Sequence, residues 1–364
     1  MVDEDLVAAI EEAALAPENW PRVLERLAAI VGSDAAAVTA RGPAGLTGTI
    51  ASPSYADAHA AYLARGRTWQ NVRPQRALAA GYAGFLTDLE ICTPEELEAD
   101  PIYREFLKPF GFGWTAGTAV PVPSGDIIIF DLARRASDGP FDRAAMERLD
   151  PYRPYLARAA LLASRQGLER ARATTDAMAL IGLPAAVLAA GGRVLSVNTP
   201  FEQLEPRVVA RAMGLVGLAD PQAEELLRKA VAAVEQASSP VPRSVPMAAT
   251  EEGPAIIAHL VPLRRSARDI FAGGQIVMLV TEVVAPGVPE TALLTGLFDL
   301  TPAESRLARA VAAGITLPDI AAAGGTSIGT LRTQLKSVMA KTGTRRQVDL
   351  VRLLLGAAPP SRLH

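Results

Sequence analysis

Apolar residues follow two spacings in the first part of the chain. Over residues 4–31 they recur every three or four positions, which predicts two helices separated by a break at Pro17–Pro21. Short apolar runs bounded by turn residues come next, and we expect them to be strands: 35–40, 117–122 and 127–132. Because helices precede and separate the strands, residues 1–150 are predicted to form one α+β domain.

A long helix is expected between Tyr155 and Ile181. Steps of four and three separate the members of its weak heptad seam: Ala157, Leu161, Ser164, Leu168, Ala171, Thr175 and Met178. Two interpretations are open. Either the helix packs on one of the chain's own domains, or it pairs with a second copy and relays a signal between two sensor domains. We define residues 151–181 as a connecting helix.

The stretch 182–285 predicts a second α+β domain. Gly191-Gly192 is a hairpin signal between two strands, and Asn198 is expected to cap a short helix. Apolar periodicity predicts a longer helix at 221–236. The predicted strands are 185–190, 193–197, 243–248, 255–262 and 275–283.

Four short helices are expected after a Pro/Gly-rich linker, which we place at 286–296. Thr301 and Glu304 form a capping box with Pro302 at the first helical position. Thr316 and Ser327 have the character of caps for the second and third helices, and the fourth covers about 347–355. The remaining residues, 297–364, are therefore predicted to form an all-α domain.

Charge is distributed unevenly along the chain. The net charge is −3, but residues 299–364 contain nine Lys/Arg and four Asp/Glu, a local charge of +5. Residues 1–298 therefore carry −8, which is typical of one basic module on an acidic body. The single cysteine, Cys92, excludes an internal disulfide, and no apolar run approaches the about 18–20 residues of a membrane span. We expect a cytoplasmic protein without a membrane partner.

The third C-terminal helix carries most of this positive charge. Five basic residues and no acidic residue lie between Ser327 and Arg346, and a cationic helix fits the major groove of double-stranded DNA. Early, outward residues are candidates for base contacts, and late residues for phosphate contacts. The candidate DNA-binding residues are Ser327, Thr330, Arg332, Thr333 and Lys336, followed by Lys341, Arg345 and Arg346.

The segment 298–351 resembles the LuxR-type helix-turn-helix domain over its whole length. The similarity lies in the L-T-x-x-E opening, the A-x-G-x-[ST] end of the first helix, I-A in the second, S-x-x-T-[VL]-[RK]-T-x-L in the third, and the K-x-G after it. This resemblance implies a transcription regulator that binds double-stranded DNA. Two-fold symmetric DNA sites further favour a homodimer.

Two other segments resemble sensor domains. LPAAVLAAGGRVLSVNTPFEQL, at 183–204, is similar to the start of a PAS domain, and DPIYREFLKPFGFGW, at 100–114, is similar to GAF- or PAS-like regions that precede LuxR-type domains. The implied fold class is α+β, with two antiparallel-sheet GAF/PAS-like sensor domains joined by a long helix and followed by an all-α four-helix domain.

The turn before the third helix departs from the family pattern. Gly324 and Thr326 stand where apolar residues usually pack. An alternative function is therefore a signalling or interaction protein with sensor domains and a weakened DNA-binding module.

The sequence holds no catalytic constellation. Gly325–Gly329 matches the G-x-S-x-G motif of hydrolases, but a helix precedes Ser327, and a strand is required there. Ser327 is better explained as a helix cap. Three histidines and one cysteine form no spaced metal motif, so we expect neither an enzyme nor a protein with a metal or cofactor.

Aromatic residues concentrate between positions 55 and 114. They could line an apolar pocket for a small-molecule effector, and the candidates are Tyr62, Trp69, Tyr103, Phe106 and Trp114. For any single one of them the simpler interpretation is an ordinary core residue, since aromatic side chains dominate protein cores.

Overall fold

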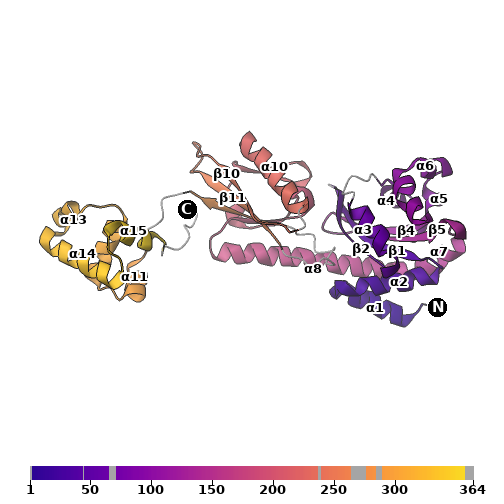
Figure 1. Ribbon diagram of the computed structural model, residues 1–364, viewed down its shortest axis with the longest axis horizontal. Helices are drawn as coiled ribbons and strands as arrows, with labels where there is room; N and C mark the ends of the chain where they lie inside the picture. The colour runs from indigo at the N-terminus through magenta and orange to yellow at the C-terminus, as the bar shows by residue number, and fades with distance from the viewer. Residues whose placement is uncertain are drawn as a thin grey trace. The chain divides into compact units, whose positions relative to one another are not determined.

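Helices and antiparallel sheets make up the protein, which has a mixed α+β architecture (Figure 1). The structure is a computed structural model, and it describes residues 2–43, 45–64, 71–236, 239–263, 276–283 and 289–356. Its residues group into two units. The first comprises Met1–Leu180, Pro184–Val245 and Ala258–Val280, and the second comprises Ile181–Leu183, Pro246–Ile257 and Thr281–His364.

Five strands form the N-terminal sheet, in the order β2-β1-β5-β4-β3. They are β1 (Ala35–Gly42), β2 (Gly45–Ala51), β3 (Leu86–Thr87), β4 (Phe112–Pro121) and β5 (Ile127–Arg135), and all neighbouring pairs are antiparallel. The three predicted strands of this region are thereby confirmed. Successive side chains of a strand point to opposite faces, so this sheet has two different sides.

One side of the sheet carries the main core. Val38 of β1 and Phe130 of β5 are register partners, and both are fully buried there with Trp20. Four helices supply the other half of this core: α1 (Glu4–Leu15), α2 (Trp20–Ile30), α7 (Arg143–Leu149) and α8 (Arg153–Leu180). The two helices predicted over 4–31 are α1 and α2, and a 3-10 turn at Pro17–Asn19 separates them.

Short helical segments cover the opposite side of the sheet. They are α3 (Ala56–Ala64), α4 (Arg73–Ala79), α5 (Asp88–Ile91), α6 (Pro94–Ala99) and the π-helical turn η3 (Ile102–Leu107). Tyr55, Phe106 and Phe112 form a second, aromatic cluster against Ala37 and Ala133 of the sheet. Tyr55 meets Phe112 edge-on, with ring centroids 5.2 Å apart.

The long helix α8 packs on the chain's own elements. Four positions of the predicted seam are buried within the first unit, namely Ala157, Ser164, Ala171 and Thr175, and α8 lies against α1, β6 and β7 (Figure 1). Thr175 is further fixed by Ser196 of β7, whose hydroxyl oxygen lies 2.9 Å from its own. The seam therefore follows the first of the two interpretations, packing within the chain.

A second five-stranded sheet has the order β10-β11-β12-β6-β7. Its strands are β6 (Ala185–Leu188), β7 (Val194–Val197), β10 (Arg243–Met247), β11 (Ile256–Pro262) and β12 (Ile276–Glu282), and a small pair, β8 (Val208–Ala210) and β9 (Val216–Leu218), was not predicted. Two helices accompany them, α9 (Thr199–Glu202) and α10 (Pro221–Gln236). Asn198 caps α9 as expected, since its side chain accepts a hydrogen bond of 3.0 Å from the Phe201 amide.

A buried ion pair joins the N-terminal sheet to the second sheet within the first unit. Arg193, just before β7, donates from Nη2 to Asp126 Oδ1 at 2.7 Å, and the two side chains are only 12% and 5% exposed. Its Nη1 donates to the Ser124 carbonyl. Asp126 and Ser124 belong to the β4–β5 turn, in which Gly125 adopts a φ of +81°. A charged pair this well shielded is stable only because each partner satisfies the other.

Five helices of the second unit lie after residue 290: α11 (Thr291–Phe298), α12 (Pro302–Ala312), α13 (Leu317–Gly324), α14 (Ile328–Thr342) and α15 (Gln347–Gly356). Four were predicted. The fifth, α11, begins inside the predicted linker 286–296, which is a correction. Leu294 of α11 is fully buried in the same core as Leu307, Leu335 and Leu350, so this apolar residue anchors a helix where the composition indicated a linker.

We expect Arg193→Met to lower the free energy of unfolding of the first unit by about 3–5 kcal/mol, because it leaves the buried Asp126 carboxylate without its guanidinium partner. Urea unfolding followed by tryptophan fluorescence reports on it, since all three Trp residues lie within 1–150. The double variant Arg193→Met/Asp126→Asn should recover part of the loss. Unchanged urea midpoints for the single variant would show that the pair contributes nothing.

Candidate functional site

The helix α14 begins at a side-chain cap and presents its apolar residues inward. Ser327 accepts a hydrogen bond of 3.1 Å from the Thr330 amide, which confirms its role as a cap. Leu331, Leu335 and Val338 are buried in the core of this helical cluster. Only the sides of α14 that face away from this core are therefore available to contact a partner.

The basic residues of α14 fall into two groups. Arg332 and Lys336 are exposed, one helical turn apart, and neither forms an ion pair with a residue that the structure describes. Thr333 lies between them, also exposed, and its hydroxyl donates to the Gly329 carbonyl at 3.1 Å. Arg345 and Arg346 are exposed as well, between α14 and α15. All four cations are therefore accessible to an anionic partner.

Lys341, which was predicted to contact phosphate, is exposed, but its ammonium group already has partners within the chain. Its Nζ lies 2.8 Å from Glu304 Oε2 and donates to the Asp299 carbonyl at 2.9 Å. Glu304 also caps its own helix at Thr301 and accepts a 2.6 Å hydrogen bond from Ser337. Hydrogen bonds from Lys341, Ser337 and Thr301 hold the pKa of Glu304 at about 2. This carboxylate ties α12 to α14.

The turn between α13 and α14 is held by backbone geometry. Gly325 takes a left-handed φ of +64°, which favours glycine, and ends α13. No residue of α13 is buried, and Gly324 is exposed. Gly324 thus adds no apolar packing to this turn.

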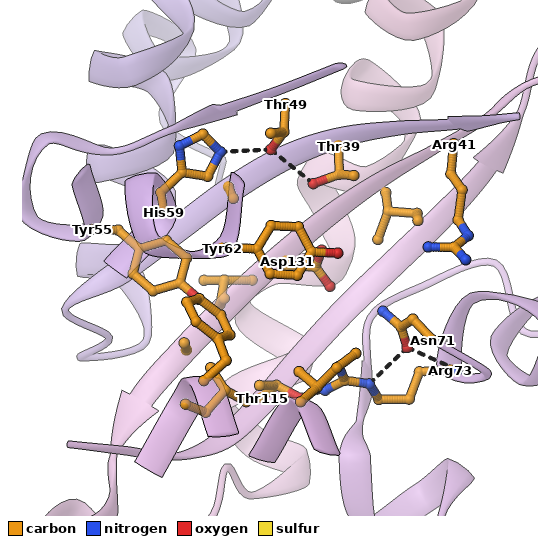
Figure 2. A pocket seen from close by; sticks show the side chains of 17 residues that line it. Thr39, Arg41, Thr49, Tyr55, His59, Tyr62, Asn71, Arg73, Thr115 and Asp131 are labelled. Atoms are coloured by element: carbon orange, nitrogen blue, oxygen red, sulfur yellow. Dashed lines mark hydrogen bonds between the residues drawn. The ribbon is translucent and has the colours of Figure 1, made fainter. Parts of the chain in front are cut away.

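A cavity lies over the second side of the N-terminal sheet (Figure 2). Its volume is about 70 Å³, and a single buried water needs about 10–15 Å³ of such volume. The floor is formed by β1, β2, β4 and β5, and the walls by α3, α4 and η3. The labelled residues of its lining are Thr39, Arg41, Thr49, Tyr55, His59, Tyr62, Asn71, Arg73, Thr115 and Asp131. The rest of the lining is apolar, for example Ile102, Phe106 and Ile129, so the cavity combines charged and polar groups with the apolar surface that was predicted.

Arg73 is fixed by a network at one end of the cavity. Its Nε donates to Asn71 Oδ1 at 3.0 Å, and its Nη1 donates to the hydroxyls of Tyr103 and Thr115 at 3.1 and 3.0 Å. Tyr103 in turn donates to Asp88 Oδ2 at 2.6 Å. The guanidinium is thus held in place by three side chains.

Asp131 supplies the negative charge of the cavity. Burial raises the pKa of its carboxyl to about 6, against the opposite effect of Arg73. Its register partner on β4 is Gly117, where a Cβ would come within 3.1 Å of Oδ1. The glycine leaves room for the carboxylate, which accepts no hydrogen bond from any described residue.

A chain of hydroxyls and an imidazole lies along another wall (Figure 2). His59 Nε2 is 2.9 Å from Thr49 Oγ1, which is 3.0 Å from Thr39 Oγ1. Burial lowers the pKa of His59, so its ring is neutral at pH 7. Burial also raises the pKa of Tyr62, which keeps its hydroxyl protonated. These groups can donate or accept hydrogen bonds without adding charge.

The five predicted ligand residues do not gather at one place. Tyr62 and Phe106 line the cavity with ring centroids 5.2 Å apart, and Tyr103 lies behind it in the Arg73 network. Trp114 packs on the helical core at the opposite side of the sheet, so it does not line the cavity. Trp69 lies outside the described residues.

The sequence prediction missed the polar residues of the cavity. Asp131 was the available signal, because it interrupts the apolar run of a strand that was predicted to be buried, and an ionisable group in such a place is often functional. Arg73 and Asn71 gave no comparable signal, since their positions depend on contacts with distant Tyr103 and Thr115.

Two further observations concern metal ligands and membrane spans. Within the described ranges, no group of three or more His, Cys, Asp or Glu residues is arranged to hold a metal ion. Over the same ranges, every helix is too short or too polar to cross a lipid bilayer.

Comparisons with known proteins give only distant similarities. No protein-family model and no curated protein matches the chain. Among solved structures, a phage VqmA–DPO complex is 17% identical, with 53% of this chain and 89% of that chain covered and a TM-score of 0.23. Escherichia coli SdiA is 11% identical, with 94% and 90% covered and a TM-score of 0.27. At TM-scores this low, the similarities support no conclusion about fold or function.

We expect Glu304→Gln to lower the free energy of unfolding of the C-terminal helices by about 2 kcal/mol at pH 7, because charge-assisted hydrogen bonds become neutral ones. The ordinary pKa of this carboxyl is 4.5 and its folded value is about 2, so its contribution is fully present above 4.5 and lost as the pH falls from 4.5 to 2. Thermal unfolding of wild type and variant, followed by circular dichroism from pH 7 to 3, measures this. A difference between them that does not shrink below pH 4.5 contradicts the assignment.

Proposed function

We propose that the protein is a DNA-binding transcription regulator of the LuxR type, active as a homodimer and controlled by a small molecule sensed in its N-terminal domain. The observation that carries the proposal is the exposed cationic side of α14, which follows α13 in a helix-turn-helix arrangement. Arg332 and Lys336 are exposed on this side, the first in the second turn of the capped helix and the second near its middle. In this position they reach base edges in the major groove.

The other candidate residues take different roles on the DNA. Thr330 and Thr333 lie in the first half of α14, and the methyl group of Thr333 contacts a thymine methyl. Arg345 and Arg346 bind phosphates and fix the register of the helix without reading sequence. Ser327 orients the helix through its cap.

The sensor role rests on the polar cavity of the N-terminal domain. It lies beneath the short helices of that domain, and its charged groups face inward. We further propose a GAF/PAS-like domain at 1–150, a connecting helix at 151–181, a PAS-like domain at 182–285 and the DNA-binding domain at 297–364, with α11 extending the last towards residue 291. Ligand binding shifts the balance between conformations of the dimer that bind DNA differently.

A second candidate is a signalling protein whose DNA-binding module is weakened. The specific observation behind it is α13, which has no buried residue and ends at the exposed Gly324. A helix anchored only by partly buried Leu317, Ile320 and Ala321 orders α14 less firmly than a packed turn would.

We expect Arg332→Ala/Lys336→Ala to weaken binding to the DNA upstream of the protein's own coding sequence by at least about thirtyfold, since each base contact contributes about 1–3 kcal/mol. Fluorescence anisotropy at several salt concentrations measures the affinity. Arg306→Ala/Arg352→Ala removes the same charge from exposed positions of α12 and α15 and serves as the control. DNA binding that is equal in both double variants, or absent in wild type at every salt concentration, contradicts the proposal.

The turn can be tested with adjacent glycines. Gly324→Ala should raise the free energy of unfolding by about 0.5–1 kcal/mol, because the residue is helical and its Cβ would meet only Thr326 Oγ1, at 4.0 Å. Gly325→Ala should lower it by about 1 kcal/mol because of its left-handed φ. Thermal unfolding of the full chain measures both changes. DNA affinity that rises in Gly324→Ala would favour the weakened module, whereas unchanged affinity favours the regulator.

A further inference from the structure

Three charged side chains line the cavity, Asp131, Arg73 and Arg41, and the first two lie in it without direct contact. Asp131 on β5 and Arg73 at the start of α4 both line it, yet they form no ion pair and no hydrogen bond. The Arg73 Nη2 donates to no described residue, although Nε and Nη1 are fully used. The Asp131 carboxylate and Arg73 Nη2 are therefore both available for hydrogen bonds in the same cavity.

Keeping Asp131 in this state costs stability. The carboxylate is partly buried and accepts no hydrogen bond from a described residue, which disfavours its charged form, and burial accordingly raises its pKa to about 6. The surrounding fold nevertheless makes room for it, since Gly117 stands opposite with no side chain. The cost of keeping this carboxylate is understandable if a ligand supplies the hydrogen-bond donor that the fold does not.

Size limits what that ligand can be. A cavity of about 70 Å³ corresponds to about five to seven water molecules. Tyr62 and Phe106 give it an apolar wall, while Thr39 and Thr49 offer hydroxyls. Long acyl chains exceed this volume, and small polar molecules do not.

We propose that the cavity binds a small zwitterion of amino-acid type, with its ammonium group on Asp131 and its carboxylate group on Arg73. The proposal rests on the proposed function only in assigning a ligand to the N-terminal domain. Asp131 accepts hydrogen bonds from the ammonium group, and Arg73 Nη2, held by the Asn71, Tyr103 and Thr115 contacts, donates to the carboxylate. Charge selects the ligand at both ends, and the cavity volume limits its side chain.

The first test uses the wild-type full-length protein. Thermal shift and isothermal titration calorimetry are run with glycine, L-alanine, L-serine, L-threonine and L-valine. For L-valine, 3-methylbutanoate lacks the ammonium group and 2-methylpropylamine lacks the carboxylate. We expect at least one zwitterion to bind, and each half-molecule to bind at least about tenfold more weakly than the parent. Binding by none of the zwitterions, or by either half-molecule as tightly as L-valine, overturns the proposal.

The second test uses Asp131→Asn, which keeps the shape and removes the charge. The variant should bind the zwitterion about ten- to a hundredfold more weakly, while its ligand-free melting temperature stays equal or rises because a buried charge is gone. Asp57→Asn, on the exposed side of α3, is the control and should change neither quantity. Equal zwitterion affinity in Asp131→Asn and wild type contradicts the proposal.

The outcome is separable from the proposed function. If zwitterions do not bind while wild type still binds DNA in the anisotropy titration, only the ligand assignment fails. If zwitterions bind and DNA does not, the ligand assignment stands and the regulator proposal fails.

Discussion

Successive side chains of β5 point to opposite faces of the N-terminal sheet, and the rest of this domain depends on that alternation. Phe130 is buried against Trp20 with ring centroids 5.5 Å apart, whereas the next residue, Asp131, faces the cavity. The apolar face binds α1, α2, α7 and α8 and supplies the hydrophobic stabilisation of the domain. Because the core on this side stabilises the domain, the other side of the sheet can hold polar groups whose burial costs free energy.

Two carboxylates, Glu304 and Asp131, show the difference between a charge that has partners within the fold and one that has none in direct contact. Glu304 is paired with Lys341 and Ser337, and its pKa falls to about 2. Asp131 has no direct partner, and its pKa rises to about 6. The first shift stabilises the folded helices at neutral pH, and the second destabilises the folded domain. The carboxylate of Glu304 thus joins α12 to α14, whereas the carboxylate of Asp131 has no hydrogen-bond donor among the described residues.

Local signals were sufficient to predict much of the fold. The caps at Asn198, Thr301 and Ser327 were readable because a capping side chain bonds to an amide only two or three residues away. Three strands of the N-terminal sheet, β1, β4 and β5, were readable from their apolar runs, whereas β2 and β3 were not predicted. The helix α11 was missed because Pro and Gly just before it indicated a linker, while the burial of Leu294 depends on contacts with residues far along the chain.

The candidate site was less predictable for the same reason. Helical periodicity predicted that Lys341 lies off the apolar stripe, but not that Glu304, 37 residues earlier, binds its ammonium group. The concentration of aromatic residues suggested that Trp114 lines a pocket. Because side chains alternate along β4, Trp114 faces the other side of the sheet from Thr115, which lines the cavity. The β4 register shifts between Phe112 and Trp114, so the first faces the aromatic cluster and the second the helical core. Only the paired strand β5 defines that shift.

The position of Asp131 within β5 gives the proposed sensor a physical connection to the second sheet. The strand begins at Ile127, directly after Asp126, whose carboxylate binds Arg193 next to β7. Ser124 in the same turn accepts from Arg193, and its amide donates to Ser164 of α8 at 3.4 Å. A displacement of β5 caused by a ligand on Asp131 therefore moves Asp126, the partner of Arg193. Since a buried ion pair tolerates little loss of geometry, this turn is where ligand binding can reach the second sheet.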